Sequence, residues 1–143
     1  MPRVADEFVM DASAALAMAF ADERTPEVEA METRLMNGEA ALTAANFHVE
    51  VLEGLLRGVR ENRISEPDAL AWLNVLDSYQ ITTAPIWPLG NGAVWMLARQ
   101  VNISAYDAGY LYLAKTRGLK LATVDGPLVN KAAKAGVGLL FDR

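Results

Sequence analysis

The chain has 143 residues, 52% of them hydrophobic and 22% charged, with a formal net charge of −5. This composition excludes a disordered chain and predicts one packed domain over residues 1–143, because a chain of this length buries about two thirds of its unfolded surface. Cysteine is absent and no apolar run reaches 18 residues, which excludes disulfides, thiolate metal sites and membrane-spanning helices and favours a cytoplasmic location.

The first third of the chain predicts a strand followed by two helices. Residues 8–11 form a short apolar run that ends in an acid, and the alanine-rich segment 13–20 predicts a helix with Ser13 as its N-cap. Thr25 and Pro26 are a cap and first-turn pair, and the helix that they open is predicted to run through Met36. Asn37 and Gly38 then provide the left-handed stop.

The middle of the chain continues this alternation. Residues 41–45 predict a short strand, and apolar residues at the helical period predict a helix over about 47–62. Ser65 caps the next helix, and residues 80–85 predict a strand that Pro85 and Pro88 end.

The last third adds three helices and two strands. We expect helices over 93–101 and 106–116, the second closed by Gly118, and a strand over 119–124. A final helix precedes a last strand over 137–141. Alternating strands and helices predict an α/β fold, a three-layer α/β/α sandwich with a central parallel sheet of about five strands and right-handed crossovers.

Two acids stand directly after predicted strands, where parallel sheets bind their ligands. Asp11 ends the first strand and Asp125 follows strand 119–124, with a hydroxyl residue two positions from each, Ser13 and Thr123. These hydroxyls can orient the carboxylates. Helix capping explains either aspartate equally well when each is taken alone.

Two further acids lie on predicted helices. Glu50 stands in the apolar stretch FHVEVL, where a carboxylate on the core-facing edge is unexpected, and Asp107 opens a helix, where the helix dipole is a sufficient explanation. Glu53, in contrast, has Arg57 four residues later and is interpreted as half of a surface ion pair.

Four segments carry a family resemblance. In order along the chain, FVMDASAAL, FHVEVLEGLL, SAYDAGYLYLA and LATVDGPL resemble the four acidic motifs of PIN domains, especially those of VapC-type toxins from toxin–antitoxin pairs. They span residues 8–128, and the segment VGLLF resembles the last strand of that fold. The resemblance implies a metal-dependent endoribonuclease that hydrolyses RNA with a metal-activated water.

The resemblance also implies roles for individual residues and for partners. The carboxylates of Asp11, Glu50, Asp107 and Asp125 would be catalytic metal ligands, with Ser13 and Thr123 in support. Carboxylate oxygens without cysteine favour Mg²⁺ or Mn²⁺ over zinc or copper. The implied partners are an RNA substrate, a cognate antitoxin protein and a second copy of the chain in a homodimer.

The net negative charge argues mildly against nucleic acid, but its distribution is uneven. Residues 1–56 hold three basic and eleven acidic residues, whereas residues 57–143 hold ten basic and seven acidic ones, so the second part can present a basic rim. The strongest phosphate-binding candidates are Arg57, Arg60 and Arg63, although a solvated helix face explains them as well.

Three other functions are compatible with parts of the pattern. A non-catalytic PIN-like scaffold that binds protein or RNA would keep the same acids, and a phosphatase for small phosphomonoesters would use similar ligands. A receiver-type signalling domain is less favoured, because it needs an acid pair just after the first strand and Asp6 and Glu7 precede that strand here.

Overall fold

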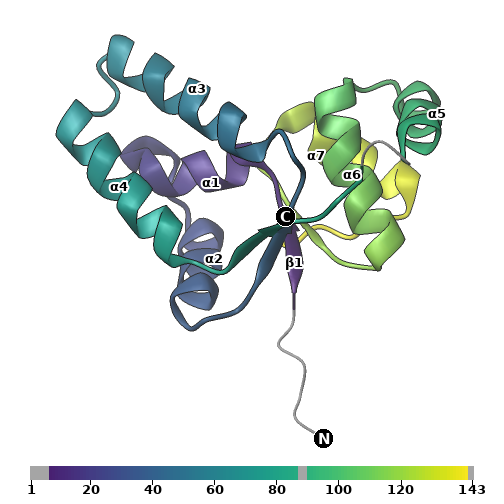
Figure 1. The fold of residues 1–143 in the computed structure, drawn as a ribbon, viewed down its shortest axis with the longest axis horizontal. Coiled ribbons are helices and arrows are strands. Elements are labelled where there is room, and N and C mark those ends of the chain that lie inside the picture. Colours follow the sequence, from purple (N-terminus) through teal and green to yellow (C-terminus); the bar gives the residue numbers. More distant parts are fainter. Residues whose placement is uncertain (1–6, 87–89, 142–143) are drawn as a thin grey trace, which may run out of the picture.

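The computed structural model describes residues 7–86 and 90–141, which form an α/β fold (Figure 1). The elements of the first part are β1 (Phe8–Met10), α1 (Ala12–Ala19), the 3₁₀ turn η1 (Ala21–Glu23), α2 (Pro26–Met36), β2 (Ala41–Thr43), α3 (Phe47–Arg60), α4 (Glu66–Ser78) and β3 (Ile81–Thr83). Those of the second part are α5 (Asn91–Val101), α6 (Ala105–Arg117), β4 (Leu121–Ala122), α7 (Gly126–Ala132) and the 3₁₀ turn η2 (Ala133–Ala135).

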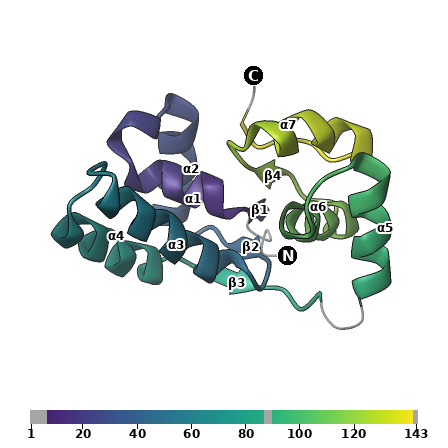
Figure 2. The same ribbon diagram turned by 90° about the horizontal axis from the view of Figure 1, so that it is seen from above.

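The strands form one parallel sheet in the order β3-β2-β1-β4. Helices α1 to α4 lie on one side of the sheet and α5 to α7 on the other, which gives three layers (Figures 1 and 2). The predicted α/β/α architecture is therefore confirmed in outline. Because the strands are parallel, their carboxyl ends share one edge, and β1 lies between two neighbours at the middle of that edge.

The predicted count of about five strands is wrong for the described residues, which form four. Residues 137–141 contribute only one bridge, between Leu139 and Leu121, supported by hydrogen bonds of 2.9 Å from Leu121 N–H to the Gly138 carbonyl and from Leu140 N–H to the Leu121 carbonyl. A longer strand has no room to pair, because β4 itself has only two residues.

Most predicted helix boundaries agree with the structure because local capping sets them. Thr25 and Ser65 accept hydrogen bonds from backbone N–H groups three residues later, and Gly118 ends α6 with a positive φ of 66°. Ser13 is not the N-cap of α1 as predicted, since Asp11 caps that helix instead. Pro88 lies outside the described residues.

The core surrounds β1, whose three residues are completely buried. Helix α1 packs against α3 at unusually short range, because Gly54 and Gly58 of α3 face Leu16 and Phe20. A Cβ at Gly54 would lie 2.3 Å from a Leu16 methyl carbon, and one at Gly58 would lie 2.5 Å from the Phe20 ring. A Cβ at either position would therefore require Leu16 or Phe20 to shift. Among the helices of the described residues, none is long and apolar enough to cross a membrane.

Candidate functional site

The four predicted carboxylates come from four separate segments and lie where helices begin. Asp11 and Asp125 are the N-caps of α1 and α7, directly after β1 and β4, while Glu50 and Asp107 lie in the first turns of α3 and α6. The two capping interactions confirm the structural explanation given for Asp11 and Asp125. They do not use all the carboxylate oxygens, so capping and ligand binding are compatible.

Asp11 is the most enclosed of the four, with 3% of its surface exposed. Its Oδ1 accepts hydrogen bonds from Ser13 Oγ at 2.7 Å and from Ala14 N–H at 2.8 Å, and its Oδ2 accepts one from Thr123 Oγ1. Burial nevertheless raises the pKa of Asp11 to about 6, because desolvation outweighs these hydrogen bonds. The charge of Asp107 adds to the rise.

Ser13 and Thr123 connect the ends of β1 and β4. Their hydroxyl oxygens are 3.2 Å apart, Ser13 Oγ accepts from Val124 N–H at 3.0 Å, and Thr123 Oγ1 accepts from Asp125 N–H at 3.1 Å. Both hydroxyls therefore fix the Asp11 carboxylate and the backbone that leads into Asp125. This geometry fits the predicted supporting positions of the two residues.

Glu50 is half-buried and receives two hydrogen bonds on one oxygen. Asn46 Nδ2 and the hydroxyl of Tyr110 both donate to Glu50 Oε1, the latter at 3.3 Å. Burial raises the pKa of Glu50 above its ordinary value, and the charge of Asp125 raises it further.

Asp107 completes the group on the α6 side. Burial raises its pKa to about 6, and the charges of Asp125 and Glu50 contribute, in that order. Each of the four acids thus either raises the pKa of another acid of the group or has its own pKa raised by one. The structure brings the four predicted side chains within electrostatic range of each other at the carboxyl edge of the sheet.

The donor set suits a hard divalent cation, since four carboxylates, two hydroxyls and an amide are all oxygen ligands or their supports. As the side chains stand, no three His, Cys, Asp or Glu residues within 7–86 and 90–141 are grouped closely enough to hold a metal ion. The carboxylates therefore share a neighbourhood without forming a ready metal site. Their assignment as ligands stays a prediction.

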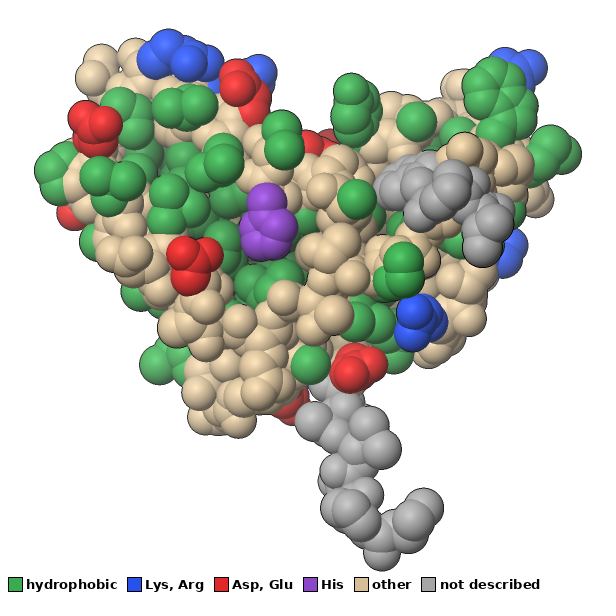
Figure 3. Space-filling view, in the orientation of Figure 1, with side chains coloured by type: hydrophobic (Ala, Val, Ile, Leu, Met, Phe, Trp, Pro, Cys, Tyr) green, Lys and Arg blue, Asp and Glu red, His purple; other side chains and the backbone are tan. Residues whose placement is uncertain are grey.

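The space-filling view supports an open site. A notch separates the two groups of helices, and acidic side chains are visible in it (Figure 3). The notch leaves these acidic side chains open to solvent on this face of the molecule (Figure 3).

The three predicted phosphate-binding arginines differ in availability. Arg63 pairs with Glu23 at 2.6 Å and with Asp22 at 3.0 Å, and Arg60 contacts Glu53 at 3.4 Å. The expected pair between Glu53 and Arg57 is thus wrong, because Arg60 takes that carboxylate two helical turns away. Arg57 is exposed and makes no ion pair with a described residue.

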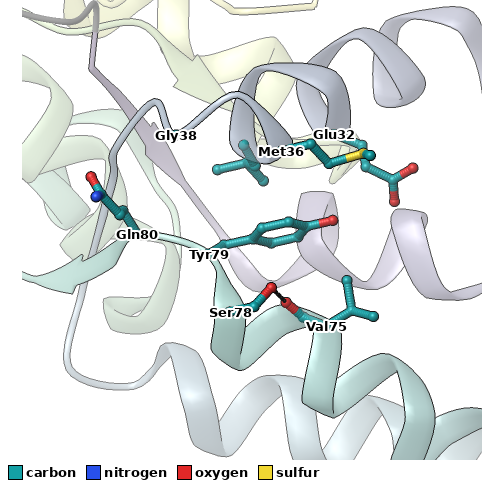
Figure 4. A pocket seen from close by; sticks show the side chains of 8 residues that line it. Glu32, Met36, Gly38, Val75, Ser78, Tyr79 and Gln80 are labelled. Atoms are coloured by element: carbon teal, nitrogen blue, oxygen red, sulfur yellow. Dashed lines mark hydrogen bonds between the residues drawn. The ribbon is translucent and has the colours of Figure 1, made fainter.

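A separate pocket of about 530 Å³ lies between the ends of α2 and α4 (Figure 4). Glu32 and Tyr79 line it, and Arg24 binds Glu32 at 2.7 Å. None of the predicted site residues lines this pocket. Its acid is already neutralised by an arginine, unlike the four carboxylates at the carboxyl edge of the sheet.

Comparison with known proteins identifies a similar fold but does not show a family for this chain. No family model and no curated protein sequence matches the chain. The structure is similar to the crystal structure of PAE2754 from Pyrobaculum aerophilum, with a TM-score of 0.66 and 24% identity over 92% of this chain and 96% of that one. At this identity the likeness shows the fold alone.

Sequence reasoning missed three residues of this region. Asn46 and Tyr110 bind Glu50, and Thr43, completely buried at the end of β2, donates a hydrogen bond of 2.8 Å to the Met10 carbonyl. Helical spacing could have found two of them, since Asn46 precedes Glu50 by four residues and Tyr110 follows Asp107 by three. No local signal marks Thr43, because its partner is 33 residues away.

Proposed function

We propose that this protein is a metal-dependent endoribonuclease of the PIN type that acts as the toxin of a toxin–antitoxin pair. The observation that carries the proposal is the gathering of Asp11, Glu50, Asp107 and Asp125 at the carboxyl edge of a parallel sheet. The charges of Glu50, Asp107 and Asp125 each raise the pKa of another of these acids. Folding gains nothing from such repulsion, whereas a bound cation would relieve it.

The chain supplies positioning and charge for hydrolysis. Ser13 and Thr123 keep the Asp11 carboxylate in one orientation, and the pairing of β1 with β4 brings it to Thr123, two residues before Asp125. When bound, Mg²⁺ or Mn²⁺ would activate a water for in-line attack and neutralise the phosphoryl oxygens, leaving a 5′-phosphate and a 3′-hydroxyl. The residues present fit such a cation in chemistry.

The lobe of α5 to α7 favours an anionic substrate. The basic residues of α5 to α7, of the loop before β4 and of η2 make no ion pair with any residue of the described ranges. They are Arg99, Lys115, Arg117, Lys120, Lys131 and Lys134. Asp107 and Asp125 are the only acids of 91–141. Unpaired cations on the same lobe as Asp107 and Asp125 are suited to phosphates of RNA that extend beyond the acidic site.

The proposal includes two protein partners in the cytoplasm. An antitoxin would place an arginine among the four carboxylates, because a guanidinium pairs bidentately with carboxylates where the cation otherwise binds. A second copy of the chain would cover some of the exposed apolar side chains, which include Val49, Leu52 and Leu56 on α3 and Trp95 and Met96 on α5.

Cleavage of a labelled single-stranded RNA in Mn²⁺ tests the activity. Asp11→Asn and Asp107→Asn should reduce cleavage by orders of magnitude, because each removes a charge that attracts the cation without changing side-chain volume. Glu53→Gln is the matched control, as its carboxylate lies on the exposed face of α3, and it should stay near wild type. Wild-type cleavage by Asp11→Asn would overturn the assignment.

A non-catalytic scaffold is the second candidate. The absence of a ready group of three ligands among the described side chains favours it. Such a protein would bind RNA or an antitoxin equally well in chelator and would not cleave RNA in Mn²⁺, so the same assay separates the two.

A further inference from the structure

Glu50 is held through one oxygen only. Asn46 and Tyr110 both donate to Oε1, and no described residue donates to Oε2. Two donors on one carboxylate oxygen fix the rotation of the group, and they leave the second oxygen as its free acceptor. The carboxylate is therefore oriented by residues that belong to different elements.

Tyr110 ties this carboxylate to two other parts of the site. It is 1% exposed, lies one turn after Asp107 on α6, and is within range of the charge of Asp11. Burial and the charges of Glu50 and Asp11 raise the pKa of the Tyr110 phenol. The hydroxyl donates to Glu50 Oε1 at 3.3 Å.

Asn46 occupies the N-cap position of α3 without capping it. An asparagine there normally accepts a hydrogen bond from a first-turn N–H group, and here its side chain makes no such bond. Its Nδ2 donates to Glu50 instead, while its Oδ1 is buried without a hydrogen-bond partner among the described residues. Helix stability does not explain this arrangement, whereas orientation of Glu50 does.

We infer that Asn46 and Tyr110 are positioning residues that turn Glu50 so that Oε2 binds the cation as a one-oxygen ligand. This inference rests on the proposed metal-dependent function. Outer partners of a ligand affect metal affinity because they fix the orientation of the ligand and its basicity.

The test is the Mn²⁺ affinity of the full chain, measured by titration calorimetry. Tyr110→Phe keeps the buried ring and removes only the hydroxyl, and Asn46→Ala removes the second donor. Each should weaken Mn²⁺ binding by roughly tenfold or more. Tyr112→Phe is the matched control, because Tyr112 lies on the same helix and packs partly against the core without touching Glu50. It should bind as wild type does.

A double-mutant cycle separates positioning from a general structural effect. If Tyr110 acts through Glu50, Tyr110→Phe should change Mn²⁺ affinity little in a Glu50→Gln background. Equal losses in both backgrounds would overturn the inference, and so would wild-type affinity of both Tyr110→Phe and Asn46→Ala alongside a weakened Glu50→Gln. Either of these two outcomes would leave the proposed function standing. A wild-type chain that binds no Mn²⁺ would defeat both, and the partly exposed Asn46 keeps the test valid if Tyr110→Phe fails to fold.

Discussion

Ionisation of Asp11 should destabilise the metal-free protein, and Asp11→Asn should reveal by how much. Burial raises the Asp11 pKa from 3.8 to about 6 in the folded protein. One pH unit corresponds to about 1.4 kcal/mol, so the rise is equivalent to about 3 kcal/mol of lost stability once Asp11 is ionised. The folded pKa lies above the unfolded one. The stability from protonated Asp11 is therefore complete below pH 3.8 and disappears as pH rises through about 6.

The variant removes this dependence. Asparagine keeps the volume and an oxygen that can accept from Ala14 N–H and Ser13, but it carries no charge. In chelator, Asp11→Asn should become more stable than wild type by up to about 3 kcal/mol between pH 4 and pH 7. With an m-value of about 2 kcal/mol/M, this corresponds to about 1.5 M in the urea midpoint.

Urea unfolding followed by circular dichroism at pH 4, 5, 6 and 7 measures this change. Comparison of variant and wild type at each pH cancels the other titrating groups. Glu53→Gln serves as the control, and its difference from wild type should stay within about 0.5 kcal/mol, as for most surface substitutions. A difference between Asp11→Asn and wild type that does not grow with pH would refute burial as the source of the raised pKa.

Three further outcomes are expected. Millimolar Mn²⁺ should stabilise wild type by about 2.7 kcal/mol at 100 times Kd, and Asp107→Asn should gain less in the same thermal shift assay. Gly58→Ala should lower the free energy of unfolding by about 1–3 kcal/mol through overpacking against Phe20. Gly126→Ala is the control and should cost far less, because a Cβ there meets no atom within 4 Å. Equal losses in the two variants would contradict this packing argument. Light scattering should give a mass near twice 15.5 kDa, and a monomer at tens of micromolar would count against the homodimer.

The helices were predictable because their signals are local. Thr25, Ser65 and Gly118 each end or begin a helix through bonds to residues within a few positions, so the sequence alone indicates them. The alternation of elements and the order of the four acidic segments were also predictable. They correctly indicated an α/β fold with the acids at one edge of its sheet.

The β4 region was overpredicted for a physical reason that local sequence does not contain. The run 119–124 has the composition of a six-residue strand, yet only Leu121 and Ala122 belong to one. The chain beyond them bonds to site side chains, with Val124 N–H donating to Ser13 and Thr123 to Asp11. Those partners are more than 100 residues away in the sequence. The bonds of Ser13 to Thr123 and Val124 span the same separation, so the local sequence indicates only a helix cap at Ser13.

The two glycines of α3 have a consequence for where activity can be lost. Asp11 and Glu50 begin the two helices that meet at Gly54 and Gly58, one and two turns further along α3. A methyl group added at either glycine would push α1 and α3 apart. Asp11 and Glu50, which lie at the starts of these helices, would then separate. Random mutagenesis should therefore yield inactive, folded variants well outside the notch, and reverting substitutions that shorten Leu16 or Phe20 should restore them.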